Sequence, residues 1–295
     1  MIPRRATVPS AVVLALVATL LGGPAGPAAA APKPPADCSA AASFEHARFP
    51  RSPDVDNRWF PLEPGTRFDM RGTVVEDGAT HRHRIVTTVT RLTKVLDGVR
   101  TVVVLDQDYD NGILQESELA FMAEDSRGRV WNVGEYPEEY DGGKLAGAPS
   151  TWISGIAGAA AGIGMPARPH LGSRAYLQGA ARSVGFRDCA QVVRTGQRIC
   201  VPAGCYRHVL VIEEWAPLEP DGGEQLKYYA PGVGNVQVAA VGGGTPENLR
   251  LADVRRLHGS ALAAVDALAL KQDGRGYHVS PDVYGRTPRA VPSHR

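Results

Sequence analysis

The sequence lacks an excess of charge of either sign. Its 32 Lys and Arg residues are balanced by 31 Asp and Glu residues, which gives a formal net charge of +1. Proteins that bind nucleic acids or anionic membrane surfaces carry clustered positive charge. We therefore predict that nucleic acid is not a partner of this chain.

Motifs for nucleophilic, metal-dependent or nucleotide chemistry are also missing. The sequence contains no G-x-S-x-G, no H-E-x-x-H and no phosphate-binding P-loop pattern. The stretch AGIGMPA at 161–167 is rich in glycine, but neither a strong strand pattern nor a helix pattern flanks it, which argues against phosphate binding there. These absences favour a non-catalytic protein over an enzyme and predict no cofactor.

The apolar run near the N-terminus is too short to span a membrane. Residues 11–21 are apolar except for one Thr, follow Arg4 and Arg5, and precede the small residues 28–31. A membrane-spanning helix needs about 20 apolar residues, whereas this arrangement is typical of a secretory signal peptide. We expect residues 1–31 to be removed on export, leaving a secreted, extracellular protein without stable membrane insertion. A retained anchor is the alternative.

Cysteine is scarce, and an even number in an oxidising compartment favours disulfides. Four cysteines allow three connectivities. Cys200 and Cys205 could face each other across a tight hairpin, but we favour pairing Cys189 with Cys200 and Cys38 with Cys205. Zinc is not expected because the sequence has no C-x-x-C pair and no His at ligand spacing beside these cysteines. The residues before Cys38 also lack the pattern of a lipidation site.

Strand-forming segments separated by turn residues run through most of the chain. Residues 84–96 contain four Thr and three Val, and Asp97-Gly98 is a two-residue hairpin signal before the apolar segment 99–105. Similar segments recur as far as residue 257, which suggests about ten short strands. We predict a mainly β fold, either an antiparallel sandwich or a half-open barrel, supported by an apolar content of 43%.

The expected boundaries follow from shifts in composition. Residues 32–57 are rich in Pro and Ala and form an extended leader, and the β domain covers 58–274. Within it, 141–172 is rich in Gly, Ala and Pro and is predicted to be a long loop over the sheet. One helix is expected at 260–274, with Ser260 as its N-cap and Gly274 at its end. The tail, 275–295, is predicted to be extended or loose.

Two segments, 121–133 and 227–238, share one plan: an aromatic and apolar arm, a turn containing Gly, and an arm rich in Val. We interpret both as β-hairpins in which Gly permits the turn. The stretches 123–140, 154–172, 201–220 and 227–238 resemble a family of exported, functionally uncharacterised bacterial proteins common in actinobacteria, and the resemblance covers most of residues 57–287. The resemblance implies a secreted β protein and no known activity. This chain has Asn132 and Val133 where aromatic residues are usual in that family, and its cysteines are an addition.

The 227–238 hairpin is also similar to hairpins of lipoprotein-carrier-like half-barrels. That second resemblance is confined to this one stretch, Tyr-Ala-Pro-Gly-Val-Gly at 229–234. It implies a curved antiparallel sheet with a concave face, and it supports the mainly β prediction.

The densest acidic stretch, DQDYDNGILQESE at 106–118, suggests a calcium site. Three Asp residues stand at i, i+2 and i+4, as in a calcium loop, but Asn111 and Ser117 occupy the places where the helix–loop–helix motif has Gly and Glu. A solvated loop between strands is the alternative. The candidate calcium ligands are Asp106, Asp108, Asp110 and Glu116.

Two histidines, His81 and His83, would point to the same face of a strand and could share a metal. No third ligand is evident, so we interpret them as part of an exposed hairpin arm. Further along, Asp125 and Glu135 lie near aromatic residues, as the carboxylates of a sugar-cleaving site would. Acids on the surface near a turn are the plainer interpretation.

We expect a secreted, non-catalytic β domain that binds an apolar small molecule or a cell-envelope component. The large side chains that could contact such a ligand are Trp131, Trp152, Met165 and Tyr229. A binding protein should have an apolar cavity beneath Trp152 and Met165 without a buried acid pair. A secreted carboxylate-dependent hydrolase should bring two carboxylates together in a cleft, and a purely structural envelope protein should have a solid core.

Overall fold

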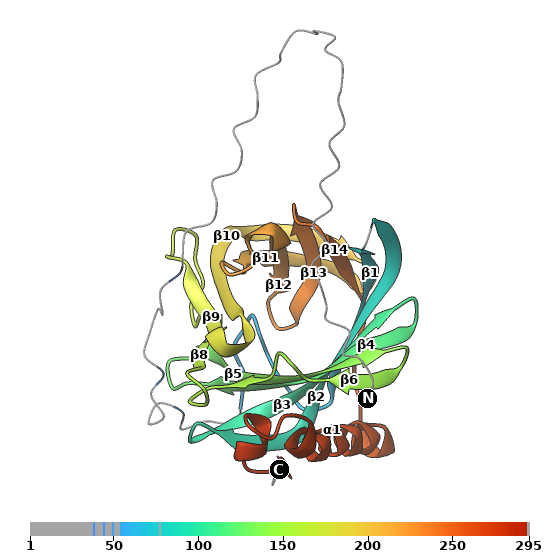
Figure 1. Ribbon diagram of the computed structural model, residues 1–295. Helices are drawn as coiled ribbons and strands as arrows, with labels where there is room; N and C mark the ends of the chain where they lie inside the picture. Colours follow the sequence, from blue (N-terminus) through green and yellow to red (C-terminus); the bar gives the residue numbers. More distant parts are fainter. Residues whose placement is uncertain (1–37, 39–43, 45–48, 50–53, 77, 294–295) are drawn as a thin grey trace, which may run out of the picture. The chain divides into compact units, whose positions relative to one another are not determined.

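The computed structural model describes residues 38, 44, 49, 54–76 and 78–293 (Figure 1). The expected signal peptide and most of the expected leader lie outside the described residues. Within the described part, strands dominate and one long helix lies near the C-terminus.

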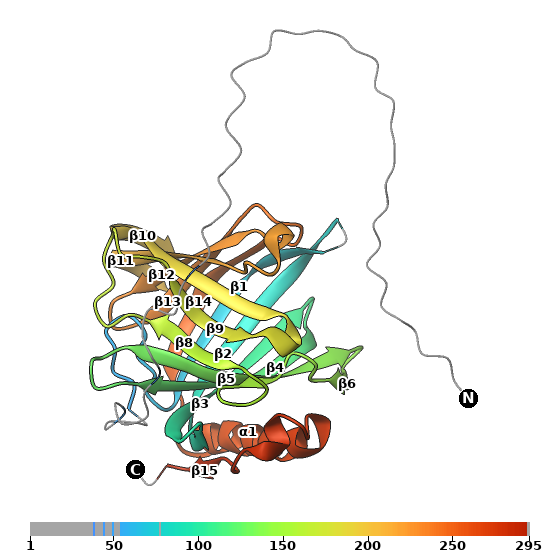
Figure 2. The same ribbon diagram turned by 60° about the vertical axis from the view of Figure 1, so that its left-hand side comes forward.

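Twelve antiparallel strands form a closed barrel. Neighbouring strands pair in the order β1-β14-β13-β12-β11-β10-β9-β8-β5-β4-β3-β2, and β1 also pairs with β2, which closes the ring (Figures 1 and 2). The prediction of a mainly β antiparallel fold is confirmed, but the sheet is a complete barrel and not a sandwich or a half-open barrel. The strands are β1 (Thr66–Glu76), β2 (Ala79–Leu96), β3 (Val99–Asp110), β4 (Ile113–Glu124), β5 (Val130–Asp141), β8 (Ala160–Met165), β9 (Tyr176–Ala181), β10 (Phe186–Val201), β11 (Gly204–Trp215), β12 (Glu224–Ala230), β13 (Gly234–Val241) and β14 (Glu247–Arg256).

The turn signals in the sequence are found where they were expected. Asp97 and Gly98 both have positive φ, +47° and +77°, and join β2 to β3. The segment 121–133 joins β4 to β5, and the segment 227–238 joins β12 to β13. Both are antiparallel hairpins, so period-2 alternation and turn residues correctly predicted local pairing.

The Gly-rich segment 141–172 is not a loop over the sheet. It forms β6 (Lys144–Gly147), β7 (Trp152–Ile153) and β8, and β8 connects β5 to β9 and so completes the wall. Small residues are needed because the backbones approach closely. A Cβ on Gly162 would lie 2.2 Å from the carbonyl carbon of Gln178. The prediction failed because a strand made of small residues lacks the β-branched pattern used to recognise strands.

The helix α1 (Gly259–Val279) is longer than predicted and packs outside the barrel against β2 and β4 (Figure 2). Its N-cap is His258 instead of Ser260, and it continues through Gly274. Gly276 lies within the helix and packs closely against Tyr284. Only glycine fits at this position, because a Cβ would be 2.4 Å from the Tyr284 ring. The expected loose tail therefore contains the last helical turn, followed by a 3-10 turn, η4 (Tyr284–Arg286), and β15 (Val291–Pro292), which pairs with β2.

A polar cluster joins α1 to the outer face of the barrel. The Lys94 side chain is fully buried, and its Nζ donates to Asp273 Oδ1 at 2.7 Å, to Tyr277 Oη at 2.9 Å and to the Pro288 carbonyl at 2.6 Å. The rings of Tyr277 and Tyr284 lie beside the same ammonium. With the pairs Arg275–Glu138 and Arg91–Asp266, these contacts form what we call the helix-side cluster.

The four cysteines form two disulfides, as expected, but the favoured pairing is wrong. The bonds are Cys38–Cys189 and Cys200–Cys205. In the β10–β11 hairpin, Cys200 lies directly opposite Cys205, so the strand register decides the pairing. No helix of the described part of the chain is both long and apolar enough to cross a membrane.

Candidate functional site in the barrel lumen

A cavity of about 300 Å³ lies inside the barrel. Side chains that line it alternate along each strand, for example Ile85 and Thr87 on β2, or Lys227 and Tyr229 on β12. This is the period-2 pattern of a strand with one face toward the lumen. Much of the lining is apolar, and its main apolar residues are Phe60, Leu62, Phe68, Met70, Val104, Met122, Val233, Val238 and Leu249.

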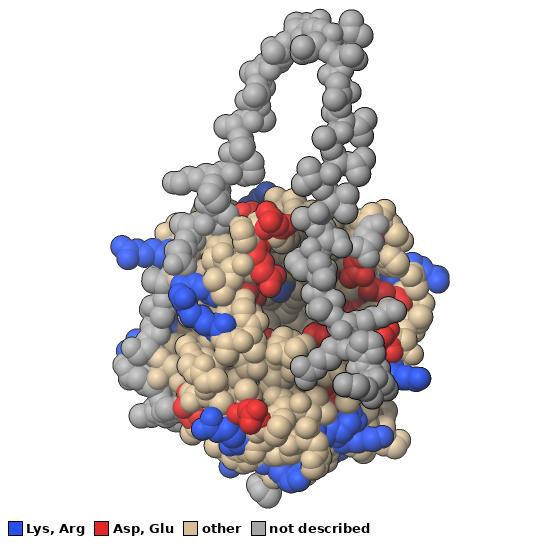
Figure 3. All heavy atoms as spheres, viewed as in Figure 1, with Lys and Arg blue, Asp and Glu red and all other residues tan. Residues whose placement is uncertain are grey.

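The cavity lining also contains acidic residues. Asp106 on β3 lies directly opposite Glu118 on β4, and both line the cavity with Glu247 of β14 and Lys227. In the space-filling view, acidic side chains gather around the hollow near the middle of the face that is shown (Figure 3). The site therefore combines an apolar surface with a group of carboxylates.

Further acids from more distant strands belong to the same group, because each changes the pKa of another member or of Lys227. From these interacting groups we select nine carboxylates and two cations, Lys227 and His83. We call this set the lumen cluster. Its carboxylates are Asp106, Asp108, Asp110, Glu116, Glu118, Glu135, Asp188, Glu214 and Glu247.

Lys227 is the central cation of the lumen cluster. Its Nζ lies 2.6 Å from Glu214 Oε2, and 29% of its side chain remains exposed, toward the cavity that it lines. Burial disfavours the charged ammonium, but the attraction and hydrogen bond of Glu214 outweigh this effect and raise the Lys227 pKa. Lys227 is thus a permanent positive charge, largely satisfied by Glu214.

The remaining carboxylates are less well compensated. Burial and the repulsion of Glu135, Glu116 and Asp106 raise the pKa of Glu118 well above its ordinary range. Burial and neighbouring acids also raise the pKa of Glu116 and of Asp188 to about 7. Like charges in a partly desolvated space cannot all be ionised without cost. The lumen therefore favours a proton or another cation among its carboxylates.

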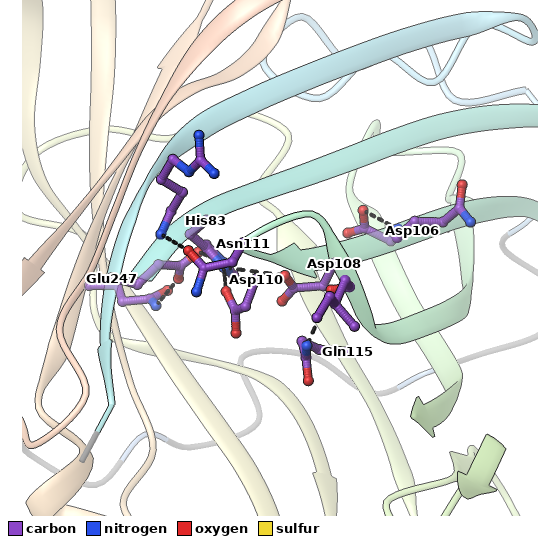
Figure 4. Close-up of polar contacts among 11 residues, drawn as sticks. His83, Asp106, Asp108, Asp110, Asn111, Gln115 and Glu247 are labelled. Atoms are coloured by element: carbon purple, nitrogen blue, oxygen red, sulfur yellow. Dashed lines mark hydrogen bonds and ion pairs between the residues drawn. The ribbon is translucent and has the colours of Figure 1, made fainter. Parts of the chain in front are cut away.

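His83 links three carboxylates at one side of this group (Figure 4). Its Nδ1 lies 2.7 Å from Asp110 Oδ1 and 3.3 Å from Asp108 Oδ1, and its Nε2 lies 3.2 Å from Glu247 Oε1. Burial lowers the His83 pKa, but the hydrogen bonds to Glu247 and Asp110 dominate and raise it to about 9. His83 is an imidazolium ion at neutral pH. The expectation of an exposed hairpin arm is wrong for this residue, since only 6% of its side chain is exposed.

The calcium candidates do not form a compact loop. Asp106, Asp108 and Asp110 alternate along β3, and Glu116 faces Asp108 from β4. Asp106 stands apart from the other two in the close-up (Figure 4). The group that could hold a metal ion is His83, Asp108 and Asp110, whose ligand atoms lie within 4.8 Å of one another. A metal would need the lone pair of a neutral His83, so it would compete with the proton that the imidazolium holds. Calcium binding remains a prediction.

The predicted ligand-contacting residues are divided between the cavity and the packing. Tyr229 lines the cavity, whereas Trp131, Trp152 and Met165 are buried and lie outside its described lining. The indole of Trp131 donates to Asp125 Oδ2 at 2.9 Å. A cavity therefore exists inside the barrel, but it is not the one expected beneath Trp152 and Met165, and its lining includes the facing carboxylates of Asp106 and Glu118, an acid pair that the binding hypothesis did not expect.

The two candidate catalytic acids have separate surroundings. Asp125 accepts backbone hydrogen bonds from Arg127 and Arg129 and so shapes the β4–β5 turn. Glu135 belongs to the lumen cluster and accepts a hydrogen bond from the Trp152 indole at 2.8 Å. No contact joins the two acids among the described residues.

Several lumen residues were not identified from the sequence. Lys227, Glu118, Asp188 and Glu214 each stand at alternating positions of a strand, which shows only that one face differs from the other. That these faces meet in one lumen depends on barrel closure. The local pattern therefore indicated which face of its strand each residue occupies, but it did not indicate which residues of other strands lie beside it.

Comparisons with known proteins add little. No protein-family model matches the sequence, and a search of curated proteins finds no significant match. Among solved structures, a candidate exported protein with a YmcC-like fold from Bacteroides fragilis is 15% identical, with a TM-score of 0.38, covering 68% of this chain and 100% of its own. A candidate lipoprotein from Parabacteroides distasonis is 14% identical, with a TM-score of 0.31, covering 68% and 99%. Likenesses this distant carry no functional conclusion.

Proposed function

We propose that this chain is an exported binding protein whose barrel lumen holds a small molecule with an apolar body and a cationic group. The observation that carries the proposal is the cavity itself, whose lining combines many apolar side chains with the carboxylates of Asp106, Glu118 and Glu247, which outnumber the cation Lys227. This refines the expectation of an apolar ligand by adding the charge that its polar end should have.

The apolar part of the lining suits the body of such a ligand. A cavity of about 300 Å³ is at the lower end of the range for small-molecule sites, which are concave and mostly apolar with a few polar groups. Phe60, Met122 and Val233 provide a surface without hydrogen-bonding side chains. A ring or a short alkyl chain would exclude water from these apolar side chains. Burial of apolar surface lowers the free energy by about 25 cal/mol per Å².

The acidic residues of the lining suit a cationic group such as an amine. Asp106 and Glu118 face each other across β3 and β4, and burial raises the pKa of both. A ligand ammonium would relieve their mutual repulsion and gain charge-assisted hydrogen bonds. An anionic ligand would add to that repulsion.

Export is supported by the N-terminal pattern and the disulfides. Cys38–Cys189 and Cys200–Cys205 leave no free cysteine among the described residues. Such bonds persist in oxidising compartments. We therefore propose an extracellular or cell-envelope location for the folded chain.

The proposal is tested with three isosteric probes: benzylamine, benzyl alcohol and benzoate. Because a ligand that binds only the folded state raises the unfolding temperature, calorimetry should show the largest rise with benzylamine and none with benzoate. In Glu118→Gln with Asp106→Asn, the preference for benzylamine should disappear. Glu213→Gln is the matched control, since Glu213 adjoins Glu214 on β11 but does not line the cavity. Equal responses to all three probes would contradict the cationic part of the proposal.

A carboxylate-dependent hydrolase is the second candidate. Facing carboxylates with raised pKa, here Asp106 and Glu118, could act as acid and base in glycoside cleavage. Turnover of chromogenic aryl glycosides by the purified protein, lost in Glu118→Gln and kept in Glu213→Gln, would support this alternative. Absence of turnover across pH 5 to 8 would favour binding alone.

A further inference from the structure

A second pocket, of about 480 Å³, has the opposite chemical character. It lies at the segment that leads from β8 to β9, and the Tyr176 ring forms one wall. Its polar lining consists of Arg129, Arg168, His170, Ser173 and Arg174, and no carboxylate is among its described lining residues. Three arginines that line one pocket are typical of a site for an oxygen-rich anion.

Buried polar atoms in this pocket lack hydrogen-bond partners. Arg129 Nε lies 2.6 Å from Asp125 Oδ2, which fixes the guanidinium, while its Nη2 is buried without a partner. Ser173 Oγ is in the same condition. A buried donor that has lost water and gained no partner is unfavourable, so an anion that accepts from both atoms would be stabilised there.

Arg168 and Arg174 complete the positive charge. Both are exposed, line the pocket and form no ion pair within the described part of the chain. Their side chains are therefore available, whereas Arg129 is already oriented by Asp125. One oriented guanidinium and two available ones would allow several hydrogen bonds to one tetrahedral group.

We propose that this pocket binds a phosphate group, held by Arg129, Arg168, Arg174 and Ser173. Arginine forks match the spacing of phosphate oxygens and form charge-assisted hydrogen bonds. The site is independent of the cationic ligand proposed for the lumen, since the two surroundings have opposite charge. The phosphate could belong to a free phosphorylated small molecule or to a lipid headgroup, and these sources are separated by experiment.

Titration calorimetry with pyrophosphate, and flotation with vesicles of phosphatidylcholine with or without phosphatidic acid, provide the two arms. Arg168→Gln and Arg174→Gln should each weaken binding about tenfold, the usual effect of losing hydrogen bonds to a charged group. Ser173→Ala should weaken it less. Arg198→Gln is the matched control, because Arg198 is exposed on β10 and does not line the pocket.

The outcomes are distinct. Pyrophosphate binding that the pocket variants weaken supports the site and a soluble ligand. Binding only to vesicles with phosphatidic acid, weakened by the same variants, supports the site and a lipid source. No binding by the wild type in either arm, or equal loss in Arg198→Gln, overturns the proposal. Unchanged thermal unfolding of the exposed-residue variants shows that folding is intact in each case.

Discussion

The helix-side cluster and the lumen cluster are two groups of charged residues on opposite faces of the same strands. On β2 and β4, outward-facing residues meet α1, and inward-facing residues meet the cavity. Beneath α1 each cation has its own acid, as in Lys94–Asp273 and Arg275–Glu138. In the lumen, Lys227 and His83 are surrounded by a surplus of carboxylates.

This difference separates charged residues that stabilise the fold from charged residues that are able to bind a ligand. A buried ion pair with its hydrogen bonds complete has nothing further to bind, and it holds one element against another. A surplus of like charge is unfavourable in the empty protein and is relieved by protons or a ligand. Sites that keep such electrostatic repulsion are commonly functional, because binding of a ligand relieves the repulsion.

The largest expected effect comes from breaking the helix-side cluster. Lys94→Met leaves Asp273 buried without its cation, and loss of one partner of such a pair is expected to lower the free energy of unfolding by about 3–5 kcal/mol. Urea denaturation measures the change. The double variant Lys94→Met with Asp273→Leu should recover much of the loss, because no buried charge then lacks a partner. A single variant as stable as the wild type would remove the distinction between the clusters.

The lumen cluster should make stability fall as pH rises. Folding raises the pKa of Asp108 and of Glu116 to about 7, from ordinary values of 3.8 and 4.5. Between about pH 4 and 7 the folded state therefore binds more protons than the unfolded state, and stability falls with increasing pH. His83, with a pKa of about 9 against an ordinary 6.5, continues the fall from pH 6.5 to 9.

The unfolding free energy should thus be a few kcal/mol lower at pH 9 than at pH 5. Urea denaturation at pH 5, 7 and 9 checks the slope. Asp108→Asn with Glu116→Gln should flatten its lower part, while the step between pH 7 and 9 should remain as long as His83 keeps its partners. A stability that increases from pH 5 to 9 would show that the lumen carboxylates are compensated.

A smaller effect, of opposite sign to most substitutions, is expected from Glu118→Gln. Glu118 and Asp106 are direct cross-strand neighbours, and removing one of two like charges in that position should increase stability at pH 8 by about 1 kcal/mol. The thermal midpoint measures this gain. At pH 4.5 the gain should vanish, because Glu118, whose pKa is raised, is then protonated in the wild type.

The smallest expected effect concerns the exposed edge of the helix-side cluster. Arg91 pairs with Asp266, but 47% of its side chain is exposed to solvent, so the pair should contribute below about 1 kcal/mol. Arg91→Ala also keeps the backbone hydrogen bond from residue 91 to Asp266. A loss in urea denaturation close to that of Lys94→Met would mean that burial does not control these pairs.

Much of the fold was predictable because its signals are local. The Asp97-Gly98 turn and the alternation in 84–96 depend on a few neighbouring residues, and both predictions hold. The prediction of a loop at 141–172 was wrong because the strand β8 has small residues, which allow close backbone approach at Gly162, in place of large side chains that would be buried. The helix was placed correctly, but its end was predicted at Gly274, whereas it continues to Val279 and Gly276 packs closely against Tyr284 within it.

The candidate site was predictable only in part. The spacing of Asp106, Asp108 and Asp110 correctly marked an acidic region, but it was interpreted as a loop, whereas a strand presents every second residue on one face. Lys227 and Glu214 lie on strands more than a hundred residues along the chain from these three Asp residues. Nothing local distinguishes them from residues that face solvent.

The sequence alone determined that this chain forms antiparallel hairpins, that its cysteines suffice for two disulfides, and that each strand has two chemically different faces. These properties follow from backbone geometry and from residues close in the chain. The tertiary structure decided that the sheet closes, which cysteines meet, and that carboxylates from distant strands share one lumen. Closure depends on the register of every strand at once, and that sum of long-range pairings is not written in any single segment.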